Sequence, residues 1–216
     1  MLLKEQREKI IEIALKVRAA KLVPLTFGNF SLRDPETGYI CISPSGMDYE
    51  ALKPEDVVVV DEDMNIIDGI RKPSVEMPMH CGILKARKDV GGVVHVHSVF
   101  ATSWASSNKA IPPVLTEGAS VFGGPIECAP VCMMGSEDLA STMIETLGDK
   151  RAVLMGNHGM ITVGDDIDSA FKFAVLAEEC AKVAFYSHII GNSKPLSPEF
   201  CQAMMHFGDN VYGQQD

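Results

Sequence analysis

Residues 3–20 combine charged and apolar side chains at helical spacing, and this pattern predicts an amphipathic first helix. The apolar positions that would face the interior are Ile10, Ile11, Ile13, Ala14 and Val17. The rest of the chain shows no internal repeat, low-complexity tract or linker-like change of composition. We therefore expect one domain that spans residues 1–216.

Three further helices are predicted downstream. One begins near Glu76 and runs to about residue 88, with Pro78 in the first turn, where proline is tolerated. A second occupies 136–148, where a serine can cap the start and a glycine ends the helix. The last and longest covers 168–191. Glu76 should therefore stand at the N-terminus of its helix.

Short apolar runs between these helices predict strands at 39–43, 57–61, 92–97, 152–155 and 160–163. The run at 57–61 is apolar on both faces, so we expect it to be a central strand. Residues 22–31 are rich in turn formers, and the tail from Ser197 looks less regular. Because strands and helices mix without strict alternation, we expect a three-layer α/β fold with some antiparallel pairing and helices on both faces.

Composition narrows the class of protein. The chain has 216 residues, 46% hydrophobic and 22% charged, with a net charge of −10, which gives no electrostatic reason to bind nucleic acid or an anionic membrane. No apolar stretch is long enough to span a membrane, and the N-terminus lacks the features of a signal peptide. The six cysteines form no CxxC pair. We expect reduced thiols and a cytoplasmic location.

Four residues carry a pattern that suggests a metal centre. His95 and His97 are two apart in a predicted strand, so both imidazoles should face the same side. His158 lies between two glycines in a turn that can approach closely, and Glu76 can add a carboxylate. Taken singly, His95 and His97 could be a half-exposed polar pair, the segment around His158 a simple turn, and Glu76 a charge at a helix start. Together, three imidazoles and a carboxylate match the ligand preferences of zinc.

Small hydroxyl-bearing turns suggest an anion site. Residues 26–31, 43–46 and 73–74 offer backbone amides and hydroxyls that can hold a phosphate without many cations. The alternative is that they are ordinary turns. No phosphate-binding glycine motif of the Walker or dinucleotide type is present.

These motifs occur in an order that resembles a known family. TFGNFS (26–31), ISPSGMDY (42–49), KPSVEMPMH (72–80), VVHVHSVFATSWA (93–105) and GNHG (156–159) follow one another as in the class II aldolase and L-ribulose-5-phosphate 4-epimerase family. The tail with Tyr212 resembles the YGQ ending of the epimerase branch. The resemblance runs from about residue 3 to the end of the chain.

The resemblance implies a fold, an assembly and a site. The fold is a central, mainly antiparallel sheet sandwiched by helices, and the assembly is a homotetramer with active sites at subunit interfaces. One Zn²⁺ per subunit would be held by His95, His97 and His158, with Glu76 as a further ligand and the catalytic acid/base. Tyr212 would be a proton donor in a neighbouring subunit's site. The residues implied in binding substrate phosphate are Gly28, Asn29, Ser45, Gly46 and Ser74.

This sequence departs from the family's motifs at several positions, and these departures favour one branch of the family over the other. Val75 replaces a second phosphate-binding serine, Ser120 replaces an aspartate that serves the epimerases, and Thr116 replaces a tyrosine of fuculose phosphate aldolases. Glu76, with no aspartate at Ser120, favours cleavage. We expect a zinc-dependent aldolase that splits a ketose 1-phosphate into dihydroxyacetone phosphate and a small aldehyde.

The leading substrate is L-fuculose 1-phosphate, which gives lactaldehyde, and a related deoxypentulose 1-phosphate follows closely. The alternative is L-ribulose-5-phosphate 4-epimerase. A further alternative is an adducin-like binding domain without activity. The resemblance implies that such domains lack the zinc histidines, so His95, His97 and His158 argue against it.

Overall fold

A single mixed sheet forms the middle of the molecule. The computed structural model describes residues 1–191 and 193–210. In these residues eight strands run in the order β4-β3-β2-β1-β5-β8-β7-β6, and every neighbouring pair is antiparallel except β6 and β7. The strands are β1 (Asn29–Arg33), β2 (Ile40–Ile42), β3 (Val58–Val60), β4 (Ile66–Asp68), β5 (Gly92–Val96), β6 (Cys128–Ala129), β7 (Ala152–Met155) and β8 (Gly159–Gly164).

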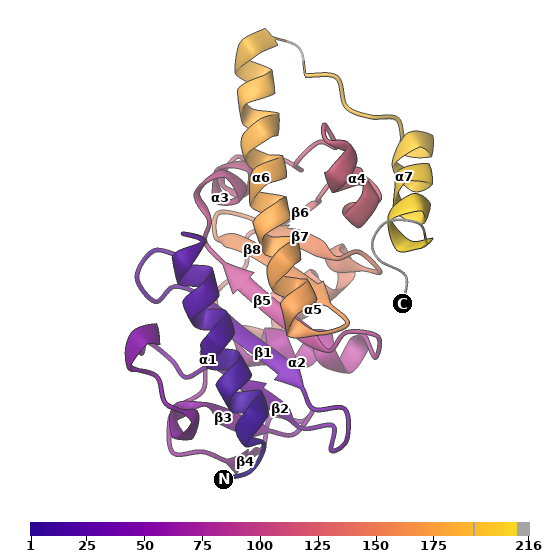
Figure 1. The fold of residues 1–216 in the computed structure, drawn as a ribbon. Coiled ribbons are helices and arrows are strands. Elements are labelled where there is room, and N and C mark those ends of the chain that lie inside the picture. Colours follow the sequence, from indigo (N-terminus) through magenta and orange to yellow (C-terminus); the bar gives the residue numbers. More distant parts are fainter. Residues whose placement is uncertain (192, 211–216) are drawn as a thin grey trace.

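Helices cover both faces of this sheet (Figure 1). On one face α1, α3 and α6 pack against the strands, and on the other face α2 and α5 do so. The pair α4 and α7 packs together at one side of α6. The helices are α1 (Lys4–Ala19), α2 (Met77–Ala86), α3 (Val99–Ser106), α4 (Thr116–Phe122), α5 (Glu137–Leu147), α6 (Ile167–Gly191) and α7 (Pro198–Asn210).

Strand β5 shows how the sequence builds two cores. Val94 and Val96 join the apolar cluster under α1, α3 and α6, whereas Val93 joins the cluster under α2 and α5. Since side chains alternate along a strand, His95 lies on the same face as Val93. Its cross-strand neighbour in β1 is Asn29. The α2 face of the sheet therefore carries polar side chains at this end of the two strands.

The three-layer α/β fold with a mainly antiparallel sheet is confirmed. The four predicted helices correspond to α1, α2, α5 and α6, and the five predicted strands to β2, β3, β5, β7 and β8. Ser136 caps α5 as expected, because its hydroxyl accepts a hydrogen bond from the Leu139 amide. All six cysteines are free thiols. No helix in the described part of the chain is long and apolar enough to cross a membrane.

Three predictions about the fold were wrong. The run at 57–61 is not central, because β3 lies second from the edge beside β4. It is apolar on both faces because Val57 and Val59 enter one core while Val58 and Val60 enter the other. The tail after Ser197 forms the regular helix α7. Part of the turn-rich stretch 22–31 is the first half of β1. Helices α3 and α4 and the short strands β4 and β6 were not predicted.

Candidate metal centre

The end of β5 brings two imidazoles together. His95 is fully buried, and His97 follows the last residue of the strand. Their ring centroids lie 4.7 Å apart, and the two Nε2 atoms lie 2.9 Å apart. His95 Nδ1 lies 3.1 Å from the Met160 carbonyl oxygen, which can only accept a hydrogen bond. This contact puts the ring proton on Nδ1 and leaves the His95 Nε2 lone pair free.

His158 reaches these rings from the turn between β7 and β8. Asn157 adopts a left-handed conformation with φ of 56°, and the glycines on either side of the pair are packed closely. A Cβ atom on Gly156 would lie 2.7 Å from the Ala129 carbonyl oxygen, and one on Gly159 would lie 2.5 Å from the Val96 carbonyl oxygen. Gly156 thus allows the turn to pack closely against β6, and Gly159 allows it to pack closely against β5. The His158 ring lies 5.0 Å from that of His95 and 4.9 Å from that of His97.

Glu76 completes the group from the N-terminus of α2. The residue occupies the N-cap position of this helix, Pro78 is the second helical residue, and Glu76 is 3% exposed. Glu76 Oε2 lies 3.2 Å from His95 Nε2, and Oε1 lies 3.6 Å from His158 Nε2. Oε1 has no hydrogen-bond partner. A carboxylate from a helix start therefore faces one imidazole from β5 and one from the turn between β7 and β8.

The arrangement fits a divalent metal ion. One nitrogen from each of His95, His97 and His158 lies within 4.8 Å of the others, and tetrahedral zinc with bonds of 2.0–2.1 Å holds its nitrogens about 3.3 Å apart. Both ring nitrogens of His158 and Glu76 Oε1 are buried without a hydrogen-bond partner. Buried polar atoms are seldom left unpaired, so these atoms indicate a ligand. A metal ion among them would satisfy Glu76 Oε1 and His158 Nε2.

The protonation states of the imidazoles and of Glu76 also suit a divalent metal ion. Burial, with a smaller contribution from the neighbouring His95, lowers the pKa of His97 to about 3 and that of His158 to about 4. Burial alone would raise the pKa of Glu76, but the neighbouring imidazoles and the hydrogen bond from the Asn29 amide outweigh it and lower the value to about 2. At neutral pH His97 and His158 are therefore neutral and the carboxylate is ionised, as metal ligands must be.

A hydrogen-bonded chain behind Glu76 was missed by sequence reasoning. The Asn29 amide donates to Glu76 Oε2 at 2.8 Å, Asn29 Oδ1 lies 2.6 Å from His80 Nε2, and His80 Nδ1 lies 2.7 Å from the Ser31 hydroxyl. His80 is completely buried, and burial lowers its pKa to about 3. The spacing of four residues between Glu76 and His80, one helical turn, was a signal that the two share a helix face.

The residues predicted to bind phosphate lie beside this hydrogen-bonded group of side chains. Segment 43–45 pairs with 72–74: the Ser45 amide donates to the Lys72 carbonyl at 3.0 Å, and the Ser74 amide donates to the Ser43 carbonyl at 3.0 Å. Ser74 is buried, and its hydroxyl accepts from the Glu76 amide at 3.2 Å. Ser45 and Gly46 are exposed, and Gly28 directly precedes Asn29 at the start of β1. Tyr212 lies outside the described residues.

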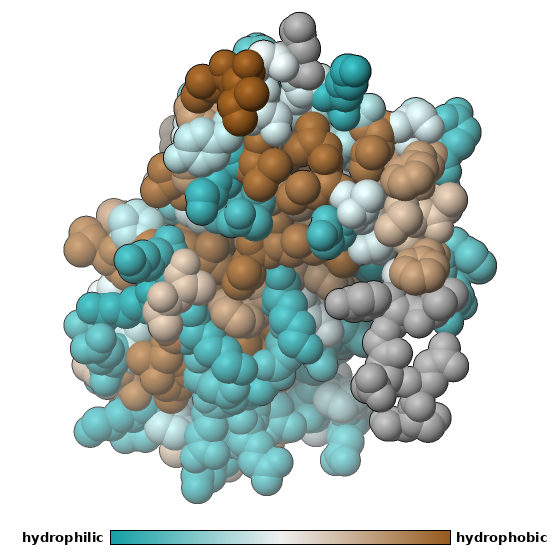
Figure 2. All heavy atoms as spheres, turned by 45° about the horizontal axis from the view of Figure 1, so that its top comes forward, coloured by the Kyte–Doolittle hydropathy of each residue, from teal (hydrophilic) through white to brown (hydrophobic). Residues whose placement is uncertain are grey.

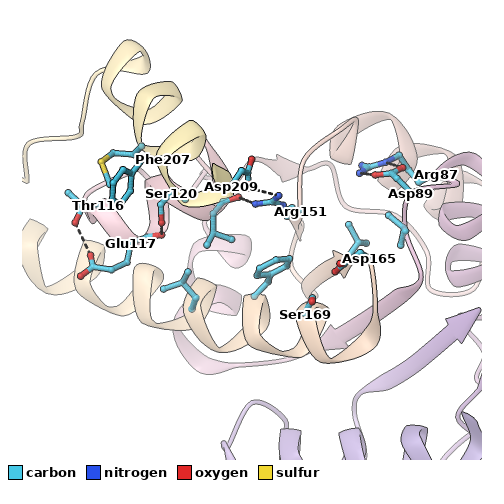
Figure 3. A pocket seen from close by; sticks show the side chains of 18 residues that line it. Arg87, Asp89, Thr116, Glu117, Ser120, Arg151, Asp165, Ser169, Phe207 and Asp209 are labelled. Carbon is cyan, nitrogen blue, oxygen red and sulfur yellow. Dashed lines mark hydrogen bonds and ion pairs between the residues drawn. The ribbon is translucent and has the colours of Figure 1, made fainter. Parts of the chain in front are cut away.

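A cavity of about 1110 Å³ occupies the other end of β5 and β8 (Figure 3). Thr116 and Ser120 line it from α4, and their hydroxyls donate to the side chain and the carbonyl of Glu117 respectively. None of the three histidines lines this cavity. Within one chain, Thr116 and Ser120, two of the positions that distinguish the branches of the family, therefore lie away from the histidine cluster.

Comparisons with known proteins identify related enzymes. A 5-deoxy-D-ribulose 1-phosphate aldolase of Bacillus thuringiensis serovar kurstaki is 38% identical over 216 residues, which is 100% of both chains. An L-ribulose-5-phosphate 4-epimerase of Salmonella paratyphi C is 34% identical over 203 residues, covering 89% of this chain and 88% of the relative. These relatives are enzymes, which indicates that this chain is one too.

Solved structures agree as well. An L-fuculose 1-phosphate aldolase superposes with a TM-score of 0.92 at 29% identity, over 95% of this chain and 97% of that one. The family model described as "Class II Aldolase and Adducin N-terminal domain" matches residues 8–185. The match covers most of the chain, as the motif order predicted. The protein therefore belongs to the class II aldolase and adducin family.

Proposed function

We propose that this protein is a metal-dependent aldolase that cleaves a ketose 1-phosphate to dihydroxyacetone phosphate and a small aldehyde. The observation that carries the proposal is the convergence of His95, His97 and His158 with the ionised Glu76, in a group whose buried polar atoms lack partners. Zn²⁺, one ion per subunit, is the metal we propose, because three imidazoles and a carboxylate suit its ligand preferences.

The preferred substrate differs from the sequence-based expectation. L-fuculose 1-phosphate led that expectation, but the relative that matches along the whole chain at 38% identity is named for 5-deoxy-D-ribulose 1-phosphate. We therefore place 5-deoxy-D-ribulose 1-phosphate first and L-fuculose 1-phosphate second. Both yield dihydroxyacetone phosphate, and they differ in the aldehyde released, acetaldehyde or lactaldehyde. In both substrates the sugar chain ends in a methyl group.

Glu76 is the residue that we propose moves the proton at carbon. In cleavage, the C4 hydroxyl loses its proton and the C3–C4 bond breaks, which releases the aldehyde and leaves the electron pair on C3. Glu76 takes up a proton from solvent and gives it to C3, and in the reverse direction it removes a proton from C3. When bound, the metal ion supplies Lewis-acid stabilisation of the negative charge that develops on the ketone oxygen. Tyr212 is the proposed partner for the proton at the C4 oxygen.

The substrate phosphate would bind where three segments meet beside Glu76. Gly28, Ser45 and Gly46 offer backbone amides and a hydroxyl, and the exposure of Ser45 and Gly46 leaves them accessible. Ser74 lies in the strand pair with 43–45, so its segment sets the distance between phosphate and Glu76. The Asn29 amide retains one hydrogen for substrate, because only one of its two N–H groups is needed by Glu76.

We also propose a homotetramer whose active sites lie between subunits. Thr116 and Ser120 lie away from the histidines of their own chain, so a role for them in catalysis requires the active site of another copy. Figure 2 shows apolar side chains gathered around the end of α6, where Phe185, Tyr186, Ile189 and Ile190 are 41–85% exposed. Light scattering on the eluting peak of a sizing column should give four times the 23.4 kDa chain mass. A monomer would contradict this assembly.

A second activity, 4-epimerisation of L-ribulose 5-phosphate, is favoured by the relative at 34% identity. Against it stands Ser120, which has a hydroxyl where the resemblance places an acid/base aspartate. The two candidates are separated by one panel of substrates with zinc-replete and chelated protein: 5-deoxy-D-ribulose 1-phosphate, L-fuculose 1-phosphate and L-ribulose 5-phosphate. Metal-dependent release of dihydroxyacetone phosphate supports the aldolase. Conversion of L-ribulose 5-phosphate without release from either 1-phosphate would replace the aldolase by the epimerase.

A further inference from the structure

The hydrogen-bonded chain behind Glu76 joins two elements that are distant in sequence. Ser31 and Asn29 lie two apart in β1 and point to the same face, and His80 comes to them from the first turns of α2. Each contact is short: 2.7 Å from Ser31 to His80, 2.6 Å from His80 to Asn29 and 2.8 Å from Asn29 to Glu76. This hydrogen-bonded chain ends on the Glu76 carboxylate, which lies close to the imidazoles of His95 and His158.

The direction of every hydrogen bond in this chain follows from Glu76. An ionised carboxylate only accepts, so Asn29 must turn its Nδ2 toward Glu76 and its Oδ1 toward His80. Oδ1 also only accepts, so the His80 Nε2 must carry the proton. In the neutral ring Nδ1 is then the acceptor, and the Ser31 hydroxyl donates to it. The tautomer of His80 with its proton on Nε2 is therefore compatible with only one orientation of the Asn29 amide, the one with Nδ2 toward Glu76.

This hydrogen-bonded chain gives the two carboxylate oxygens of Glu76 different surroundings. Oε2 accepts from Asn29 and lies 3.2 Å from His95 Nε2. Oε1 has no hydrogen bond and lies 3.6 Å from His158 Nε2. If Asn29 turned by 180° about its last bond, its oxygen would face the carboxylate and repel it. The contact with His80 opposes that turn, because the Nε2–H group needs an acceptor.

A purely structural role is the alternative for His80. The ring is fully buried, and a buried histidine with two hydrogen-bond partners can simply fill space between a sheet and a helix. An apolar side chain would fill the same space without the desolvation of two polar atoms. The structural role also does not explain why the far partner of the ring is the amide that holds Glu76.

We propose that His80 is a positioning residue for Glu76: its Nε2–H fixes the Asn29 amide, which anchors Glu76 Oε2 and leaves Oε1 free for the metal or for a proton. The inference rests on the proposed function, because it assigns to Glu76 the work in cleavage described above. His80 touches neither substrate nor metal in this account. Its effect reaches the site through Asn29 alone.

Two variants of His80 separate positioning from packing. The amide nitrogen of His80→Gln can reach the place of Nε2 and donate to Asn29, whereas His80→Asn ends near the place of Nδ1 and can contact only Ser31. Each variant keeps one of the two hydrogen bonds of the ring, so each should lower the thermal unfolding midpoint to a similar degree. They differ in the bond that leads to Glu76.

We would measure kcat and KM for release of dihydroxyacetone phosphate, zinc affinity by competition with a chelator, and the unfolding midpoint. His80→Gln should keep kcat within a few fold of the parent protein. His80→Asn should lose about 10- to 100-fold in kcat, with a smaller change in KM, because residues that orient a metal ligand have effects of this size. Zinc affinity should follow the same order.

Equal kcat and equal zinc affinity in the two variants would overturn the inference, and so would losses that simply follow the unfolding midpoints. These outcomes leave cleavage by the parent protein untouched. Failure of the parent protein to cleave either 1-phosphate would instead overturn the proposed function. The measurement of zinc affinity still tests the role of His80 in that case. Equal zinc affinity in His80→Asn and His80→Gln would contradict that role.

Discussion

The two ends of strands β5 and β8 differ in how their polar groups are satisfied. At the end with His97 and His158, several buried polar atoms lack partners and three imidazoles crowd together. At the end with Gly92 and Gly164, the cavity is large but both of its arginines are paired: Arg87 with Asp89 at 2.6 Å and Arg151 with Asp209 at 2.9 Å (Figure 3). Unsatisfied donors and acceptors, more than empty volume, indicate where chemistry occurs.

The largest expected difference between the two ends comes from removing a metal-binding imidazole at one end and an ion-paired arginine at the other. His158→Ala should lose the metal and lower cleavage about 1000-fold, because Lewis-acid stabilisation contributes several kcal/mol to the transition state. Folding should change little, since both ring nitrogens lack partners. Metal analysis, cleavage rate and urea unfolding measure the three effects.

Arg151→Met is the matched change at the cavity end. It loses the Asp209 ion pair and a hydrogen bond to the Val121 carbonyl, so we expect about 1 kcal/mol less stability, with metal and cleavage retained. Retention of full cleavage by His158→Ala would remove the basis for placing the chemistry at the histidine end.

A second pair of variants compares carboxylates. Glu76→Gln cannot take up a proton, so cleavage should fall about 100-fold or more, the usual contribution of a general acid/base, while the imidazoles keep the metal. Asp89→Asn at the cavity end should leave cleavage unchanged. Steady-state rates with metal analysis check both, and an active Glu76→Gln variant would mean that another group carries the proton.

The glycines at the two ends of β8 sharpen the comparison. A Cβ atom on Gly159 would lie 2.5 Å from the Val96 carbonyl oxygen and 3.1 Å from the His95 ring, and one on Gly164 would lie 2.7 Å from the Ala170 amide. Replacing either with alanine should cost about 1–3 kcal/mol of stability through overpacking. Only Gly159→Ala should weaken metal binding, as measured by chelator competition. Equal metal affinity in both variants would show that the His158 turn tolerates displacement.

A further effect concerns the pH dependence of stability in the metal-free protein. Burial lowers the pKa of His97 to about 3 and that of His158 to about 4, whereas the unfolded chain binds the same protons near pH 6.5. Stability is therefore full above about pH 6.5 and falls as the pH decreases toward the folded values, by about 1–2 kcal/mol per imidazole at pH 5. Urea unfolding of the chelated protein between pH 7 and 5 measures this slope. His158→Ala should flatten it, and an unchanged slope would contradict the lowered pKa of His158.

The local part of the site could be predicted from sequence. The spacing of His95 and His97 fixes their common side in a strand, and the glycines around His158 mark a turn that approaches closely. The order of five motifs added Glu76 and the fold. These features depend on residues within a few positions of one another, where periodicity and turn chemistry are informative.

The contribution of His80 could not be predicted, because it depends on β1 and α2 coming together. Asn29 and Ser31 were assigned to a turn-rich stretch, so their common face was not visible. Helix α7 was missed because its apolar side is defined by contact with α4. A local signal existed there: the Ser197 hydroxyl accepts a hydrogen bond from the Phe200 amide, and Pro198 occupies the first helical position.

Anomalous X-ray diffraction at the zinc absorption edge, on crystals of zinc-replete protein, tests the central claim most directly. The account predicts one strong peak per subunit among His95, His97 and His158, in contact with Glu76 Oε1 in the absence of substrate. A peak only in the cavity beside Arg151, or none in protein that carries zinc in solution, would contradict the assignment of the chemistry to the histidine end.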